Sequence, residues 1–175
     1  YARYLVGYFE QALKGSIFET QEEGKHLVTL QSIVENLPLL KTYKPLLKHF
    51  LSRGLFDNME SRYFHLIDRS QGLLGILDDD LVNQFDKDYL FDTFSEIFNQ
   101  PNSSSYINKM THFDLKTLLP ALLQIEDRVS MSVSIESRVP LLDKRIIDLT
   151  SATPPPIKFQ GGKTKNILKK ATRNL

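Results

Sequence analysis

Apolar residues recur at every third or fourth position along most of this chain, and that spacing constrains the fold more than any other feature. The stripes fall within residues 4–12, 27–37, 39–50, 56–67 and 81–98. A glycine or a proline follows four of them, at Gly15, Pro38, Gly54 and Pro101. The alternation typical of strands is scarce. The sequence therefore predicts an all-α fold for residues 1–175.

Composition excludes several classes of protein. The net charge of +1 gives no basic footprint for nucleic acid or for an anionic membrane. The 175 residues include no cysteine, which excludes disulfides and thiolate chemistry. No apolar run approaches the roughly 18–20 residues of a membrane span, so a cytoplasmic location is expected. The chain is already apolar and periodic at Tyr1, which predicts a fragment of a longer polypeptide.

The character of the sequence changes after Leu119. Residues 1–118 have the pattern of an amphipathic helical scaffold, whereas residues 119–175 carry polar groups that packing alone does not explain. Three successive carboxylates, Asp78 to Asp80, fit the start of a helix better than a metal site. The four histidines have no ligand-like spacing. We therefore look for chemistry in residues 119–175.

A helix opened by Pro120 and running to Val133 places Glu126 within an apolar stripe. The other members of that stripe are Leu122, Ile125, Val129 and Val133. A carboxylate that faces a core costs several kcal/mol unless it is paired. The sequence leaves two explanations open, a structural ion pair with an arginine or a carboxylate that faces an internal cleft.

The segment after this helix brings opposite charges together. Because Val139 precedes a proline, the chain there should be extended, which places Glu136 and Arg138 on the same side. Their pairing would either anchor the loop or present a guanidinium to a carboxylate or phosphate. Asp143 then stands at the expected N-cap of the next helix.

The last part of the chain combines prolines, glycines and lysines. The run Pro154 to Pro156 should be extended. After Gly161 and Gly162, residues 163–171 should form a helix with Lys163 and Lys165 at its start. These lysines are either candidates for phosphate contact or an ordinary solvated helix end.

The pattern of residues 119–171 resembles the asparagine synthase family. Residues 119–131 have the sequence Leu-Pro-Ala-Leu-Leu-Gln-Ile-Glu-Asp-Arg-Val-Ser-Met, and residues 135–143 have the sequence Ile-Glu-Ser-Arg-Val-Pro-Leu-Leu-Asp. The motifs at residues 155–158 and 163–165 match the family in order and spacing. The resemblance extends from Leu115 to Ala171, and the segment Tyr1-Ala2-Arg3-Tyr4 resembles the family separately.

This resemblance implies the helical C-terminal part of an α/β synthetase domain of the adenine nucleotide α-hydrolase-like (PP-loop) type. Such an enzyme uses ATP and Mg²⁺ to adenylate the β-carboxylate of aspartate, and ammonia from glutamine then attacks the acyl-adenylate. The expected partners are an N-terminal glutaminase domain and the PP-loop sheet of the same polypeptide, with aspartate and glutamine as substrates. The resemblance leaves open whether the enzyme forms a homo-oligomer.

The family's Ser-Gly-Gly-x-Asp-Ser loop and its catalytic cysteine are not in these residues, and its lysine-rich loop would follow Leu175. We therefore expect no complete catalytic set, no bound metal and no turnover from this chain alone. The resemblance implies that one wall of the adenylate site includes Glu126, Asp127, Arg128, Glu136 and Arg138.

Two other functions remain open. Val129 and Leu141 replace the commoner asparagine and phenylalanine of the family, which leaves room for a relative that forms lactams or modifies sugars or peptides. The plain helical scaffold of residues 1–118 also suits a non-catalytic interaction module.

Overall fold

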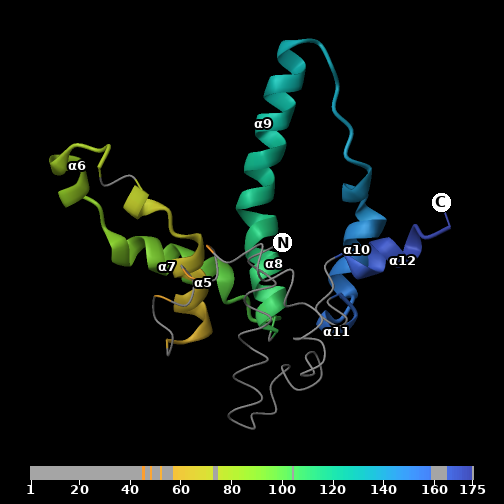
Figure 1. Ribbon diagram of the computed structural model, residues 1–175, viewed down its shortest axis with the longest axis horizontal. Coiled ribbons are helices and arrows are strands. Elements are labelled where there is room, and N and C mark those ends of the chain that lie inside the picture. The colour runs from red at the N-terminus through yellow and green to blue at the C-terminus, as the bar shows by residue number, and fades with distance from the viewer. Residues whose placement is uncertain are drawn as a thin grey trace, which may run out of the picture.

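The computed structural model describes residues 45, 48, 52, 57–72, 75–103, 105–158 and 165–174. The predicted all-α class is confirmed in these residues, because none of them forms a strand (Figure 1). Their helices are also too short or too polar to cross a membrane. The apolar residues of the three stripes predicted within residues 4–50 lie outside the described part of the chain.

Three helices form the core of the described residues. They are α5 (Met59–Ile67), α7 (Lys87–Phe98) and α8 (Tyr106–Lys116). Their aromatic rings form one cluster with centroid distances of about 5–6 Å, at Tyr63, Phe64, Phe91, Phe94, Phe98, Tyr106 and Phe113. Ile107 and Met110 of α8 are completely buried beside these rings. Burial of this apolar area provides the main stabilisation of the three-helix unit.

Polar groups connect the same three helices at the edge of the cluster. The Glu60 carboxylate on α5 accepts hydrogen bonds from the Ser95 hydroxyl and, at 2.6 Å, from the Asn99 amide. The side-chain oxygen of Asn99, Oδ1, in turn accepts from Lys109 Nζ on α8 at 2.9 Å. The network fixes the register of the helices, although exposed bonds of this kind contribute little net energy.

Residues 81–98 form two helices rather than the one apolar stripe that the sequence predicts. The helix α6 (Asp79–Asn83) ends before α7 begins at Lys87. The break occurs because Asp86 is an N-cap, with its side chain accepting from the Tyr89 N–H at 3.0 Å. Asp78 caps α6 in the same way, so the prediction that Asp78 to Asp80 begin a helix is confirmed.

The helix α9 (Leu118–Ser132) follows α8 with only Thr117 between them. Figure 1 shows α9 extending away from the three-helix core, after which the chain returns in the opposite direction to α10 (Lys144–Ala152). A short 3-10 turn, Pro140–Leu142, precedes α10. Two brief helices, α11 (Pro155–Lys158) and α12 (Asn166–Ala171), end the described chain.

The proline run adopts a different conformation from the one predicted. Pro155 and Pro156 open α11, and the Ile157 and Lys158 N–H groups both donate to the Pro154 carbonyl. The prediction that these two residues are extended is wrong. The N–H groups in the first turn of a helix have no hydrogen-bond acceptor within the helix, so a residue without an N–H group loses no bond there. Proline is therefore tolerated there.

Candidate functional site

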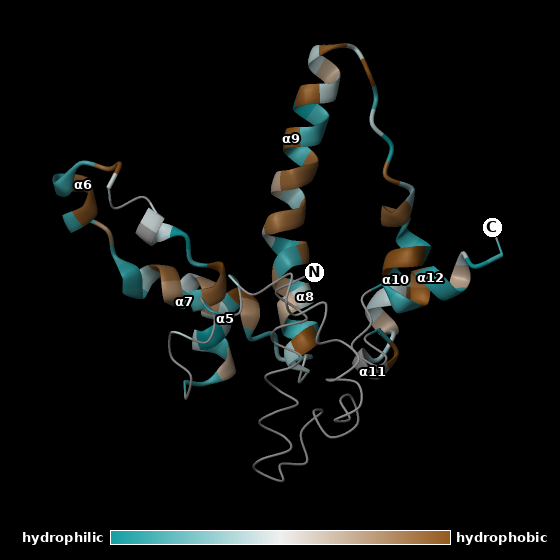
Figure 2. Ribbon diagram, in the orientation of Figure 1, coloured by the Kyte–Doolittle hydropathy of each residue, from teal (hydrophilic) through white to brown (hydrophobic). Residues whose placement is uncertain are grey.

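The charged residues of α9 lie on an open surface. Glu126, Asp127 and Arg128 are all exposed, and no described residue forms an ion pair with Glu126. The apolar stripe around Glu126 was expected to face a core, but Ile125 is 62% and Val129 is 64% exposed. Figure 2 shows these apolar bands repeating along α9. Because the stripe is exposed, Glu126 carries no burial penalty in this structure.

A tight turn reverses the chain at the end of α9. The Ser134 N–H donates to the Met131 carbonyl, and the Ile135 N–H donates to the Ser130 carbonyl, both at 3.0 Å. These two bonds form a Schellman motif, in which Ser134 takes the left-handed position at φ 58°. The turn directs residues 135–143, the signature segment, back towards α10.

Glu136 and Arg138 lie in the irregular chain after this turn and contact each other as predicted. Arg138 Nη2 donates to Glu136 Oε2 at 2.9 Å, and the two side chains are 80% and 67% exposed. An ion pair this exposed contributes at most about 1 kcal/mol. A carboxylate or phosphate could therefore displace Glu136 from the guanidinium at little cost.

Arg138 also lines a shallow hollow of about 650 Å³ between the signature segment and α10. Asp143 and Arg145 also line this hollow. Asp143 caps α10 as predicted, because its carboxylate accepts from the Arg145 N–H at 2.9 Å. The Arg145 guanidinium grips both oxygens of Asp143, at 2.9 and 3.0 Å.

The Arg145 contacts change the ionisation of the capping carboxylate. The Arg145 side chain first, and its backbone N–H second, hold the pKa of Asp143 below its ordinary value of 3.8. The same pairing raises the pKa of Arg145. The hollow therefore presents two guanidinium groups, each paired with a neighbouring carboxylate.

The sequence interpretation missed Arg145, although its position two residues after the N-cap is a usable signal. A basic side chain there can turn back onto the capping carboxylate. It also missed Lys158, whose ammonium group donates to Asn108 Oδ1 at 3.2 Å and so connects α11 to α8. Burial lowers the pKa of Lys158, since the half-buried ammonium loses hydration.

The predicted phosphate-contact residues are only partly described. Lys163 lies outside the described residues, whereas Lys165 is exposed at the N-cap of α12 with φ 58° and no side-chain capping bond. Within the described chain, no group of three histidine, aspartate or glutamate side chains could hold a metal ion.

Comparison with known proteins identifies the family of this chain. The family described as asparagine synthase matches residues 18–175, which is most of the chain. The chain belongs to the asparagine synthase family. It is also 34% identical over 116 residues to asparagine synthetase [glutamine-hydrolyzing] 1 of Bacillus subtilis strain 168. That alignment covers 63% of this chain and 18% of the relative, so the chain spans under a fifth of the curated protein. No solved structure matches it.

Membership of the asparagine synthase family places the helices in a wider context. The asparagine synthase domain has an adenine nucleotide α-hydrolase-like fold, and its family comprises ATP-dependent amidotransferase ligases that use Mg²⁺. The match covers α5 to α12, including α9 and the signature segment. Of the five predicted wall residues, Glu136 and Arg138 form a side-chain hydrogen bond with each other. The roles of all five as a site wall, and the division at residue 118, remain predictions.

Proposed function

We propose that this chain is part of a glutamine-using asparagine synthetase and supplies one helical wall of its aspartyl-adenylate site. In that reaction a carboxylate oxygen of aspartate attacks the α-phosphorus of ATP and pyrophosphate leaves. Ammonia then attacks the acyl carbon, and AMP departs with the carboxylate oxygen. The observation that carries the proposal is the family match across the segment that presents Arg138 beside the hollow.

Arg138 has a specific part in this proposal. Its guanidinium, loosely held by Glu136, would bind a carboxylate or phosphate oxygen of the reactants and orient it for attack. The same bonds would neutralise charge that builds up on phosphate oxygens, which is the chemistry that Mg²⁺ also supplies when it is bound. We place the Mg²⁺ and the glutaminase chemistry in other parts of a longer polypeptide.

Replacing Arg138 in a full-length protein that contains this chain tests the proposal. Arg138→Ala should lower kcat/KM for aspartate-dependent pyrophosphate release by about 10- to 150-fold, since a charge-assisted hydrogen bond contributes roughly 1.5–3 kcal/mol. Glutaminase activity should stay the same. The matched control is Arg173→Ala, which removes an exposed arginine outside the signature. An Arg138→Ala protein that keeps full synthetase activity would contradict the proposed role.

The 175-residue chain by itself should not catalyse ATP–pyrophosphate exchange with aspartate. Measurable exchange by the purified chain would show that the site is complete without further elements.

A related amide-forming reaction is a second candidate, favoured by the two departures from the commoner signature. Val129 on α9 and Leu141 in the 3-10 turn are both exposed, at 64% and 60%. A panel of carboxylic acids tested on the full-length protein separates the two functions. Activity that does not depend on aspartate would favour the second.

A further inference from the structure

A lysine near the end of the described chain reaches back to the three-helix core. Lys158, the last residue of α11, donates from Nζ to Oδ1 of Asn108 in the first turn of α8, at 3.2 Å. The two residues are 50 positions apart, so this bond closes a long loop of chain. That loop contains α9, the signature segment and α10 (Figure 1). The signature segment therefore lies between two attachments to α8, the helix junction at Thr117 and this bond.

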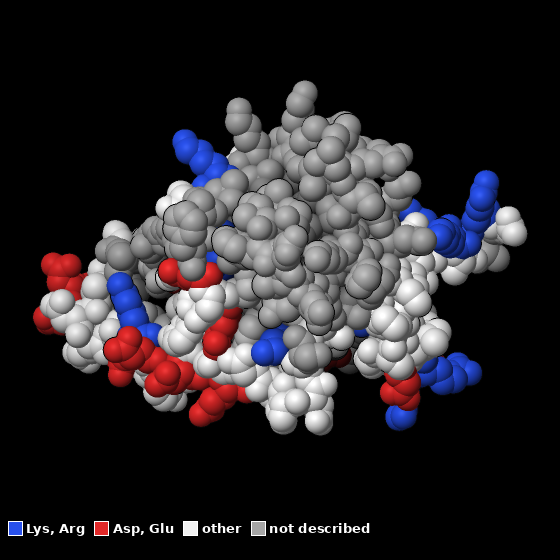
Figure 3. All heavy atoms as spheres, turned by 90° about the horizontal axis from the view of Figure 1, so that it is seen from below, with Lys and Arg blue, Asp and Glu red and all other residues white. Residues whose placement is uncertain are grey.

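The ammonium group of Lys158 is less hydrated than a lysine side chain normally is. Lysines ordinarily extend this group into water, and Figure 3 shows several lysine and arginine side chains projecting in that way. Within the described residues, Lys109 and Lys158 are half-buried and the remaining lysines are exposed. Burial lowers the pKa of Lys158, because the charged form has lost hydration. Stability alone gives no reason for this placement, since a methionine of similar length would fill the space without that loss.

Both partners of this bond are held by well-defined backbone. Ile107, next to Asn108, is completely buried in the core, and the Asn108 N–H donates to the capping Ser105 hydroxyl at 3.3 Å. On the other side, the prolines at residues 154–156 join α10 to α11, and the fixed φ of proline stiffens this connection. The bond therefore attaches α10 and α11 to a fixed point on α8.

The start of α10 is in turn connected to the chain around Arg138. The Leu142 N–H donates to the Val139 carbonyl at 2.9 Å, within the 3-10 turn that follows Arg138. The Asp143 N–H donates to the Pro140 carbonyl at 3.3 Å. Arg138 lines its hollow together with residues of this turn and of the first turn of α10. The place at which α11 is attached therefore affects where the Arg138 guanidinium lies relative to the core.

We propose that Lys158 is a positioning residue for the synthetase reaction, and that its bond to Asn108 holds the segment carrying Arg138 at a fixed place relative to the three-helix core. This inference rests on the proposed function, because it concerns the same site. Lys158 acts through Arg138 and does not itself contact the reactants. Misplacement of a reacting group by about 1 Å can lower a rate by about 10²-fold, so an attachment of this kind affects catalysis from a distance.

Distances between two spin labels on the 175-residue chain test the attachment without using the reaction. The chain has no cysteine, so Glu96→Cys on α7 and Ser151→Cys on α10, both at exposed positions, provide the only two labelling sites. Pulsed electron paramagnetic resonance should give a narrow distribution of distances between the labels. Lys158→Met and Asn108→Leu should each broaden this distribution, because each removes the bond. Asn108→Asp retains an acceptor oxygen and should keep the distribution narrow.

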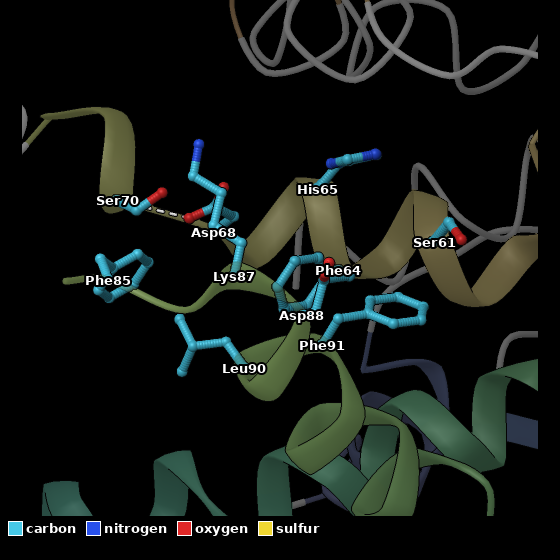
Figure 4. A pocket seen from close by; sticks show the side chains of 10 residues that line it. All are labelled: Ser61, Phe64, His65, Asp68, Ser70, Phe85, Lys87, Asp88, Leu90 and Phe91. Carbon is cyan, nitrogen blue, oxygen red and sulfur yellow. Dashed lines mark hydrogen bonds between the residues drawn. The ribbon is translucent and has the colours of Figure 1, made fainter. Parts of the chain in front are cut away.

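Lys87→Met is the matched control for the loss of a lysine. Lys87 is exposed and lies at a groove whose lining falls within residues 61–91, between α5 and the start of α7 (Figure 4). Its replacement should leave the distribution unchanged, and circular dichroism checks that every variant is folded. An unchanged distribution in both Lys158→Met and Asn108→Leu, or equal broadening by Lys87→Met, would overturn the proposed attachment.

Kinetics of a full-length protein that contains this chain test the positioning role. Lys158→Met should lower kcat/KM for aspartate-dependent pyrophosphate release about tenfold and leave glutaminase activity unchanged. Added to Arg138→Ala, it should lower the rate by less than about twofold further, because it acts through Arg138. A further tenfold loss in that double variant, or full activity of Lys158→Met, would overturn the positioning role. Full activity of Arg138→Ala would instead contradict the proposed synthetase site, and the label distances would still decide whether the attachment exists.

Discussion

Ser134 is a residue at which the backbone conformation and the amino-acid type disagree. It holds the left-handed position of the Schellman turn, which normally favours glycine. Ser134→Gly should raise the free energy of unfolding by about 1 kcal/mol. Ser132→Gly, inside the last turn of α9, should lower it by roughly 0.5–1 kcal/mol. Urea denaturation measures both, and changes of the same sign in the two variants would contradict this account of the turn.

Asp143 shows how one neighbour sets the pH dependence of a helix cap. Because its folded pKa is lowered, the carboxylate stabilises the fold fully above its ordinary value of 3.8 and loses this contribution as pH falls through the lowered pKa. Arg145→Met should raise the pKa of Asp143 towards the ordinary value, since only the backbone N–H remains as donor. NMR titration of the Asp143 carboxyl carbon measures this. Lys116→Met is the control, and an equal shift in that variant would exclude Arg145 as the cause.

In the signature segment, the sequence predicted the contacts of individual residues best. The cap at Asp143 and the contact between Glu136 and Arg138 follow from short-range rules, and both are confirmed. Burial around Glu126 was not predictable in this way. The helical period places Ile125 and Val129 on one face, but it cannot say what, if anything, covers that face.

At the scale of elements, the aromatic cluster should dominate the stability of the described chain. Phe98 is 1% exposed and stacks on Tyr63 and Phe94 at 5.5 and 5.0 Å. Phe98→Ala should lower the free energy of unfolding by about 3–5 kcal/mol, because it leaves a cavity among three helices. Tyr89→Ala on the same helix α7, where the ring is 68% exposed, should change it by less than about 0.5 kcal/mol.

Thermal unfolding of the two variants measures the difference. Similar melting temperatures for Phe98→Ala and Tyr89→Ala would show that the cluster does not hold the helices together.

Helices with a continuous apolar stripe or an evident N-cap were predictable, whereas α8 and the break between α6 and α7 were not. The helix predicted near residues 56–67 and the helix predicted to begin after Asp143 are confirmed as α5 and α10. The helix α8 was missed, although Ser105 caps it and Tyr106, Ile107 and Met110 have helical spacing. The break at Asp86 was missed because the apolar spacing continues through it while the carboxylate captures a backbone N–H.

At the scale of the whole molecule, the all-α class was predictable because periodicity is a property of many residues together. The assembly of a site was not, since it depends on contacts between distant segments. Arg138 meets Arg145 at one hollow, whereas Glu126 lies on the exposed helix α9. Spacing along the chain does not contain that information.

Only Thr117 joins α8 to α9, so a small change of angle at this residue displaces the far end of α9 by a large distance. A helix of 15 residues is about 22 Å long, so a tilt of roughly 10° at Thr117 moves its far end by about 4 Å. The orientation of α8 is set by its burial in the aromatic cluster, far from Arg138. Loosening that cluster would therefore misplace the signature turn without altering any residue in it, and errors of that size are enough to disrupt the alignment of reacting groups.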